Sequence, residues 1–103
     1  MTSYSKPTYD LARMIALIKQ GYFRTTHVAR VGAVALGLDL DGLIEVVLDL
    51  PARGLFYKTM ESNKNPGHWM DVYHTRTPAG DPVYLKLMIQ NGVLIVSLKE
   101  LQR

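Results

Sequence analysis

Residues 83–100, VYLKLMIQNGVLIVSLKE, decide the fold, because two strand-like runs flank a tight turn. Both runs are rich in the β-branched and apolar residues that favour strands. Between them, Asn91-Gly92 is the strongest short-range signal for a hairpin, since a type I′ turn needs positive φ at both central residues. The sequence therefore predicts antiparallel strands over residues 83–90 and 93–100.

A two-residue loop at Asn91-Gly92 would fix every cross-strand pair, because side chains alternate between the two faces of a strand. One face would then be apolar and available to helices, with Leu85 opposite Leu98, Leu87 opposite Val96 and Ile89 opposite Leu94. On the other face, Lys86 would lie opposite Ser97, and Tyr84 directly opposite Lys99. Cross-strand partners have Cβ atoms about 4.5–5.5 Å apart, so the phenol and the ammonium are predicted to share one solvated patch.

Two further strands are predicted upstream, over residues 55–61 and 69–76, with loops at 65–67 and 78–81. The segment before them has helical periodicity. A first helix has Pro7 or Thr8 near its start, ends before Gly21 and carries Leu11, Met14, Ile15 and Ile18 on one side.

Two more helices are predicted between Gly21 and residue 55. Thr25 or Thr26 can cap the second, which ends at Gly37 and carries an apolar stripe of Val28, Val31, Ala35 and Leu36. Asp39 can cap the third, whose apolar side comprises Leu40, Leu43, Ile44, Val47 and Leu48 and which is followed by Pro51 and Gly54. Helices followed by a run of strands predict an α+β fold, with N-terminal helices packed on one face of an antiparallel β-meander in one domain, residues 1–103.

Composition and charge limit the classes of function. The chain is 48% hydrophobic and 20% charged, and it has no stretch of the roughly 20 apolar residues that span a bilayer. Since no apolar signal core follows Met1, a cytoplasmic protein without a membrane partner is expected. The absence of cysteine excludes disulfides and thiolate metal sites. The net charge of +3 falls in the part from Leu50 onward, so a polyanion is a reasonable partner for that half.

The residues that we expect to carry catalysis are Tyr84 and Lys99, with Lys58 on a neighbouring strand. Cleavage of RNA through its own 2′-OH needs a proton acceptor, positive donors for the phosphoryl oxygens, and a proton for the leaving 5′-oxygen. Lysines suit the second task and a tyrosine can position the phosphate. Neither side chain ordinarily exchanges protons near neutral pH, and polar residues on a solvated sheet face are most often simple alternation.

The histidines leave several interpretations open. His68 and His74 have matching parity on one predicted strand, and imidazole is the usual acid–base group near neutral pH. No convincing set of carboxylates completes a zinc site with them, so no metal is predicted. The second predicted helix, Gly37 and the third helix imitate a helix-turn-helix motif. We do not expect this motif to bind DNA, because Asp41, Glu45 and Asp49 on the third helix would repel phosphate. That acidic stripe is either a solvated face or a surface for a protein partner.

Several stretches resemble the MqsR family, the motility quorum-sensing regulator toxins. The similarity covers nearly the whole chain and lies in RTTHVARVGAVALGLDLDGLIEVV (24–47), LFYKTM (55–60), HWMDVY (68–73), VYLKL (83–87) and VLIVSLKE (93–100). The resemblance implies a RelE-like toxin fold and a toxin of a type II toxin–antitoxin system. Such a toxin is an mRNA interferase, an endoribonuclease that needs no metal, cofactor or ribosome and cleaves at GC-containing, GCU-like sites.

The resemblance also implies partners. The mRNA substrate is one. The other is a cognate antitoxin that binds zinc and DNA and neutralises the toxin, so that operator DNA is contacted only through the antitoxin. Carried over by position, the family's site lysines fall on Lys58 and Lys99 and its tyrosine falls on Tyr84. Tyr57, Lys86 and Arg76 are predicted to contact RNA.

One position departs from the family pattern. Met70 stands where the family has a glutamine implicated in the site, and a thioether is only a weak hydrogen-bond acceptor. Either the glutamine is dispensable, or His68 or His74 substitutes for it, or activity is weakened. Met70 and His68 therefore remain candidate residues of the catalytic site whose roles are open. The alternative function is a catalytically weakened RNA- or antitoxin-binding module of the same fold.

Overall fold

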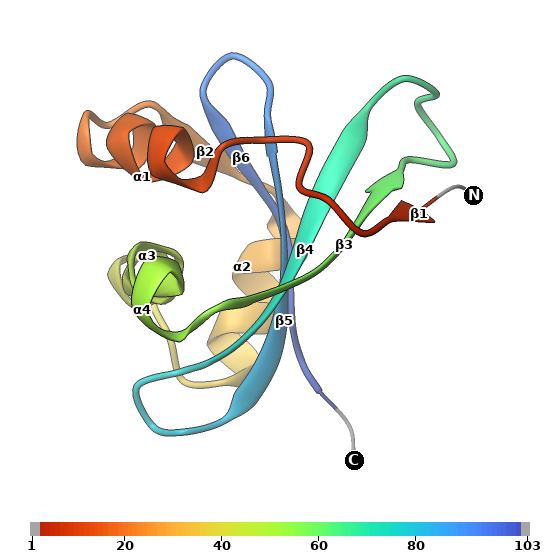
Figure 1. The fold of residues 1–103 in the computed structure, drawn as a ribbon. Coiled ribbons are helices and arrows are strands. Elements are labelled where there is room, and N and C mark those ends of the chain that lie inside the picture. Colours follow the sequence, from red (N-terminus) through yellow and green to blue (C-terminus); the bar gives the residue numbers. More distant parts are fainter. Residues whose placement is uncertain (1–2, 102–103) are drawn as a thin grey trace.

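The computed structural model describes residues 3–101. Within that range it contains four helices and a six-stranded sheet (Figure 1). In chain order the elements are β1 (Ser3–Tyr4), α1 (Leu11–Lys19), β2 (Phe23–Thr25), α2 (His27–Ala35), α3 (Leu40–Leu48), α4 (Leu50–Arg53), β3 (Leu55–Glu61), β4 (Trp69–Arg76), β5 (Pro82–Ile89) and β6 (Val93–Glu100). The predicted α+β class is confirmed. Residues 1–2 and 102–103 of the domain predicted from the sequence lie outside the described range.

The four central strands form the predicted meander, with antiparallel pairs β3–β4, β4–β5 and β5–β6. Three of them have the predicted bounds, and β5 begins one residue earlier and ends one residue earlier than expected. Two short strands extend this meander, giving the order β1-β3-β4-β5-β6-β2. The predicted antiparallel meander is confirmed, and the complete sheet is mixed because the short strand β2 runs parallel to β6. Strands of two and three residues are too short to show a period in the sequence.

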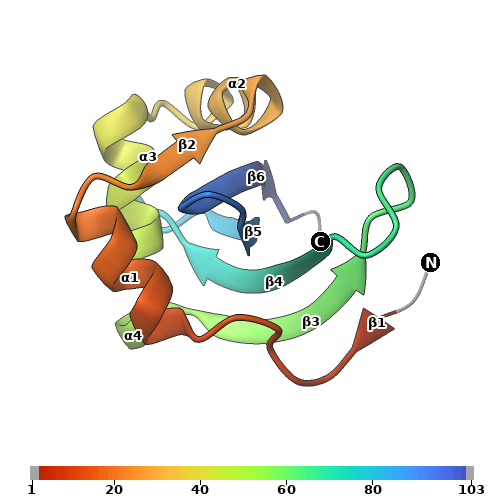
Figure 2. The same cartoon turned by 90° about the horizontal axis from the view of Figure 1, so that it is seen from above.

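The helices cover one face of the sheet and leave the other face open. Figure 2 shows α1, α3 and α4 on one side of the curved sheet, with α2 beside β2 and β6. The main core lies between these layers and includes Met14, Ile18, Leu43, Val47, Leu50, Tyr73, Leu85, Leu87, Ile95 and Leu98. We call the sheet surface away from these helices the open face.

Side-chain caps explain where α1, α2 and α3 begin. Thr26 accepts a hydrogen bond from the Ala29 amide at 3.0 Å, and Asp39 caps α3 in the same manner, as predicted. The first helix is capped by Asp10, so its predicted start near Pro7 or Thr8 was wrong. The amide of Thr8 instead donates to Asp71 in β4, which ties the segment before α1 to the sheet.

The apolar stripe predicted for α2 faces solvent, which corrects the expected packing of that helix. Val28 and Val31 are 55% and 53% exposed. The residues that α2 buries are small, Ala29 and Ala33. This buried side of α2 packs against β6.

Gly32 explains why α2 turns its small residues inward. A Cβ added to Gly32 would lie 1.9 Å from the carbonyl oxygen of Leu98, far closer than any real contact. The helix backbone therefore approaches the β6 backbone directly, and larger residues cannot occupy that side. The valines remain on the outer side as a consequence.

The hairpin between β5 and β6 differs from the prediction near its turn. Ile89 pairs with Val93, so the loop has three residues, Gln90, Asn91 and Gly92. Asn91 and Gly92 do have positive φ, at 54° and 95°. The shift of one residue moves Leu94 to the open face, where it packs beside Met88.

A β-bulge in β6 reverses that shift before the candidate site is reached. Leu87 pairs with Ile95 and Lys86 with Ser97, so Val96 is the extra residue. Val96 therefore joins the open face rather than lying opposite Leu87 as predicted. Beyond the bulge the predicted pairs are confirmed, including Tyr84 with Lys99.

Candidate functional site

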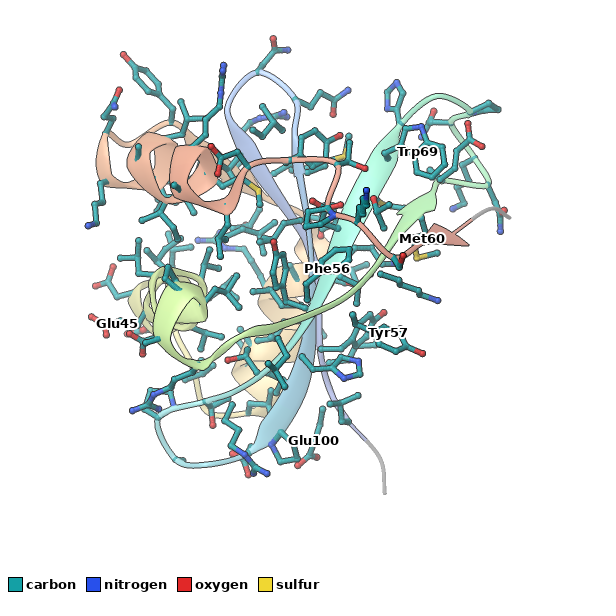
Figure 3. The ribbon with its side chains drawn as sticks, in the orientation of Figure 1. Glu45, Phe56, Tyr57, Met60, Trp69 and Glu100 are labelled. Carbon is teal, nitrogen blue, oxygen red and sulfur yellow. The ribbon has the colours of Figure 1, made fainter. Side chains whose placement is uncertain are left out.

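A bulge in β3 places two consecutive side chains of this strand at the open face. Phe56 pairs with Tyr73 and Lys58 with Val72, which leaves Tyr57 as the additional residue. Phe56 packs edge-on against Tyr73 at 5.6 Å between ring centroids, on the helix side. Figure 3 shows Phe56 projecting toward the helices while Tyr57 projects the other way. The bulge thus brings a phenol and an ammonium together from adjacent positions in the chain.

These residues line a concavity of about 360 Å³, which we call the basic hollow. Its lining side chains come from β3, β4, β5 and the residue after β6: Tyr57, Lys58, Met60, Val72, His74, Tyr84, Lys86 and Leu101. The structure therefore brings together Lys58 and Tyr84, which the sequence assigned to chemistry, with Tyr57 and Lys86, which it assigned to RNA binding. No carboxylate belongs to this lining among the residues that the structure describes.

Aromatic rings hold the charged groups of the basic hollow in place. The Tyr57 ring stacks on His74 at 4.3 Å between centroids, with 21° between the ring planes. The Lys58 ammonium lies 5.5 Å from the centroid of Tyr57, and the Lys86 ammonium 5.9 Å from that of Tyr84. Both distances fall within the range of cation–π attraction. The hollow therefore presents two ammoniums and an imidazole on an aromatic frame.

A single row across the sheet joins His74, Tyr84 and Lys99. His74 is the direct cross-strand partner of Tyr84, and Tyr84 is the direct partner of Lys99. Such partners have Cβ atoms about 4.5–5.5 Å apart. Lys99 is exposed and is not part of the lining of the basic hollow, so it lies at the rim beside Tyr84. His74, one of two histidines left open by the sequence, is the one that reaches this site.

Met70 and His68 lie elsewhere on the open face. Both line a second concavity of about 250 Å³, which we call the methionine hollow. Met70 is only 8% exposed and packs in a small apolar cluster with Met60, Val72 and Met88. His68 is exposed and precedes β4 instead of lying on it, so the predicted shared strand with His74 was wrong.

Arg76 lies at the end of β4, where its guanidinium donates to the Gly80 carbonyl at 2.9 Å. Together with Arg53 and His74 it lines a broader concavity of about 510 Å³ next to the basic hollow. Glu45 of α3 lies away from this region, as Figure 3 shows. Positive side chains therefore continue from Lys86 in β5 through Arg76 in β4 to Arg53 at the end of α4.

Two other tyrosines, Tyr73 and Tyr9, have raised pKa values but occupy structural positions outside the basic hollow. Burial and the Asp71 carboxylate raise the pKa of Tyr73 to about 12 and also raise the pKa of Tyr9. Tyr73 lies in the core, and Tyr9 donates from its hydroxyl to the Trp69 carbonyl at 2.7 Å. Neither phenol lines the basic hollow.

Within residues 3–101, no three His, Asp or Glu side chains are grouped so that they could hold a metal ion. In the same part of the chain, no helix is long and apolar enough to cross a membrane.

Comparison with known proteins identifies relatives over almost the full length. A family model described as "Motility quorum-sensing regulator, toxin of MqsA" matches residues 6–100. The chain is also 40% identical to the mRNA interferase toxin MqsR of Escherichia coli K12 over 94 residues. That alignment covers 91% of this chain and 94% of the relative. Both comparisons therefore span the helices and the central meander that carries the site.

Proposed function

The chain belongs to the MqsR toxin family, and from this membership and the basic hollow we propose that it is an mRNA interferase, an endoribonuclease that cleaves mRNA. One observation carries the proposal. Lys58, Lys86, His74 and Tyr84 come from three strands and converge on a single concavity without a carboxylate among its described lining residues. Such a surface attracts the phosphodiester backbone and can act on it.

The groups of the basic hollow divide the chemistry among them. His74 takes the proton of the ribose 2′-OH, because an imidazole is the side chain best suited to proton exchange near neutral pH. The 2′-oxygen attacks the phosphorus, and the bond from phosphorus to the 5′-oxygen breaks. Lys58 and Lys86 stabilise the charge that develops on the phosphoryl oxygens. The products are a 2′,3′-cyclic phosphate and a free 5′-hydroxyl.

Tyr84 and Lys99 act at the leaving group in this proposal. Their direct pairing in the sheet places a phenol and an ammonium side by side at the rim of the hollow. Tyr84 positions the phosphate, and Lys99 supplies the proton that the departing 5′-oxygen takes. His74 returns its proton to solvent and Lys99 recovers one from solvent, so the protein ends each cycle unchanged.

Tyr57, Lys86 and Arg76 are proposed to bind the RNA on either side of the cut. Tyr57 is 56% exposed, so a nucleobase can contact its ring beside His74 and Lys58. Arg76 and Arg53 extend the positive surface beyond His74. Contacts of this kind make RNA binding weaken as salt is added, because counterions compete for the phosphates.

The finer features are proposed from the family. The protein acts in the cytoplasm on GC-containing, GCU-like sites, without a ribosome and without a metal ion. A cognate antitoxin that binds zinc and DNA neutralises it and connects it to operator DNA. The ammoniums of the basic hollow support metal independence, since they supply the positive charge that a metal ion would otherwise bring to the phosphate.

Expression in bacteria tests this function. Growth arrest is expected, with new mRNA 5′ ends at GC-containing sites, and both effects should be lost in Lys58→Ala and in Tyr84→Phe. Lys19→Ala is a matched control, because Lys19 ends α1 on the helix side of the sheet. Unchanged cutting in both site variants would refute the assignment of these residues.

A second candidate function rests on Met70. If the family's glutamine is essential, the protein is a weakened RNA- or antitoxin-binding module of the same fold. Purified protein that binds RNA or antitoxin but leaves a GC-containing transcript intact would favour this second function. Restoring cleavage with Met70→Gln would then identify the missing group.

A further inference from the structure

The methionine hollow has the composition of a nucleobase site. Its floor is apolar and includes Met70 and Met88, which are 8% and 6% exposed. Its rim carries neutral polar side chains, among them Asn65, His68 and Gln90. Thioethers pack well against flat aromatic rings, and amides and imidazoles can donate and accept hydrogen bonds at base edges.

The rim side chains come from two loops with ordered backbones. In the β3–β4 loop, the His68 amide donates to the Asn65 carbonyl at 3.0 Å, and the Ser62 amide donates to the His68 carbonyl at 2.9 Å. In the β5–β6 loop, the Gln90 amide donates to the Gly92 carbonyl at 2.7 Å. These bonds fix the positions from which the rim side chains extend.

The polar ends of those side chains are available to a ligand. Among residues 3–101, no hydrogen bond uses the side-chain amides of Asn65 and Gln90 or the imidazole of His68. A polar rim over an apolar floor is how small flat ligands are oriented in protein sites. No lysine or arginine belongs to the described lining, so the hollow favours a neutral base over a phosphate.

The methionine hollow lies next to the basic hollow on the open face. Met60 and Val72 line the basic hollow and pack in one cluster with Met70 and Met88. Met70 lies four residues from His74 along β4, and Met88 lies four residues from Tyr84 along β5, or about 13 Å at the rise of a strand. A single-stranded RNA whose scissile phosphate lies at Lys58 and Tyr84 therefore reaches the methionine hollow with a neighbouring nucleotide.

We propose that the methionine hollow binds one nucleobase flanking the scissile phosphate and sets the sequence preference of cleavage at that position. This inference rests on the proposed function, because it needs RNA on the open face. Met70 and Met88 stack against the base, and Gln90, with Asn65 and His68, reads its edge. Recognition of single-stranded RNA commonly combines stacking with hydrogen bonds to an exposed base edge.

A pool of single-stranded RNA with random sequence provides the test. The pool is digested with the wild-type protein, Gln90→Met and His68→Ala, and the bases around each cut are counted. Gln90→Met keeps a similar length but has no amide, so the preference at one flanking position should fall about tenfold. Gln20→Met is the matched control, because Gln20 caps α1 on the helix side, and it should leave all preferences unchanged.

The outcomes separate this inference from the proposed function. If the wild type cuts the pool and both rim variants keep every base preference, the inference is wrong while the proposed function stands. If the wild type cuts nothing, the proposed function fails, and the same pool is partitioned by binding. Base enrichment among bound RNA that Gln90→Met abolishes would then support the base site; equal enrichment, or no binding, would overturn it.

Discussion

Replacing Gly32 with alanine tests the close contact between α2 and β6. The added Cβ would lie 1.9 Å from the Leu98 carbonyl oxygen, and backbone cannot move aside as a flexible side chain can. Overpacking of this kind typically costs about 1–3 kcal/mol, whereas alanine gains about 1 kcal/mol of helix propensity over glycine. Because a shift of more than about 1 Å is needed to restore an ordinary contact, the strain should exceed the gain, and a net loss of up to about 2 kcal/mol is expected.

Gly42→Ala is the matched control, because Gly42 also lies within a helix, α3, and its replacement by alanine gains the same helix propensity. Its Cβ would meet the Leu38 side chain at 3.1 Å, and that side chain can give way. This variant should be neutral or up to about 1 kcal/mol more stable. Urea unfolding followed by far-UV circular dichroism measures both free energies of unfolding. Equal effects of the two substitutions would refute the packing described for α2.

Three further predictions concern buried or partly buried residues of β4. Asp71→Asn should reduce the free energy of unfolding by about 1.5–3 kcal/mol. The Thr8 and Tyr9 amides donate to different oxygens of the Asp71 carboxylate, each at 2.9 Å, and asparagine would place an NH2 donor at one of these two positions. Urea unfolding that matches the wild type would contradict this role. The pKa of Tyr73 is about 12 in the folded protein against an ordinary 10, so its neutral phenol stabilises the fold fully below pH 10. This contribution should be lost as pH rises from 10 through 12, by about 1.4 kcal/mol per pH unit. Tyr73→Phe should remove that part of the pH dependence, and an unaltered alkaline stability profile would refute the prediction. Met70→Gln should change the base preference of cleavage more than the rate of cleavage, and mapping of the 5′ ends measures both. Faster cleavage with an unchanged preference would instead place this residue at the scissile phosphate.

The hairpin shows how far a sequence pattern predicts register. Asn91-Gly92 correctly located the turn and its positive φ values, but the loop has three residues instead of two. The bulge at Val96 corrects the error, so the predicted pairing of Tyr84 with Lys99 is confirmed although the pairs near the turn are not. Neither the loop length nor the bulge has a signal in one sequence, because both depend on how the sheet twists against its helices.

The placement of Lys58 also depended on a bulge. Strict alternation from Phe56 places Tyr57 and Lys58 on opposite faces, and only the extra residue in β3 brings both to the basic hollow. The sequence singled out Lys58 and Tyr84 but could not locate one relative to the other. His74 was recognisable as an acid–base candidate, yet its selection over His68 required the structure, which places His74 in the basic hollow and His68 in the methionine hollow.

The packing of α2 shows a different limit. Its apolar stripe has correct helical spacing, and such a stripe normally faces the core. Gly32 reverses that expectation, because a glycine between Ala29 and Ala33 permits backbone contact that valines would prevent. Periodicity identifies an apolar face, but the shape of the neighbouring strand decides which face is buried.

Digestion of one purified transcript in the presence of EDTA tests the central claim most directly. The wild type should cut it and leave 2′,3′-cyclic phosphate and 5′-hydroxyl ends. His74→Phe, which keeps a flat ring to stack on Tyr57 but has no nitrogen, should cut about 10²–10⁴-fold more slowly at neutral pH. Cleavage that stops when EDTA is added, or that proceeds at the wild-type rate in His74→Phe, would contradict the account of the basic hollow as a metal-independent site for RNA cleavage.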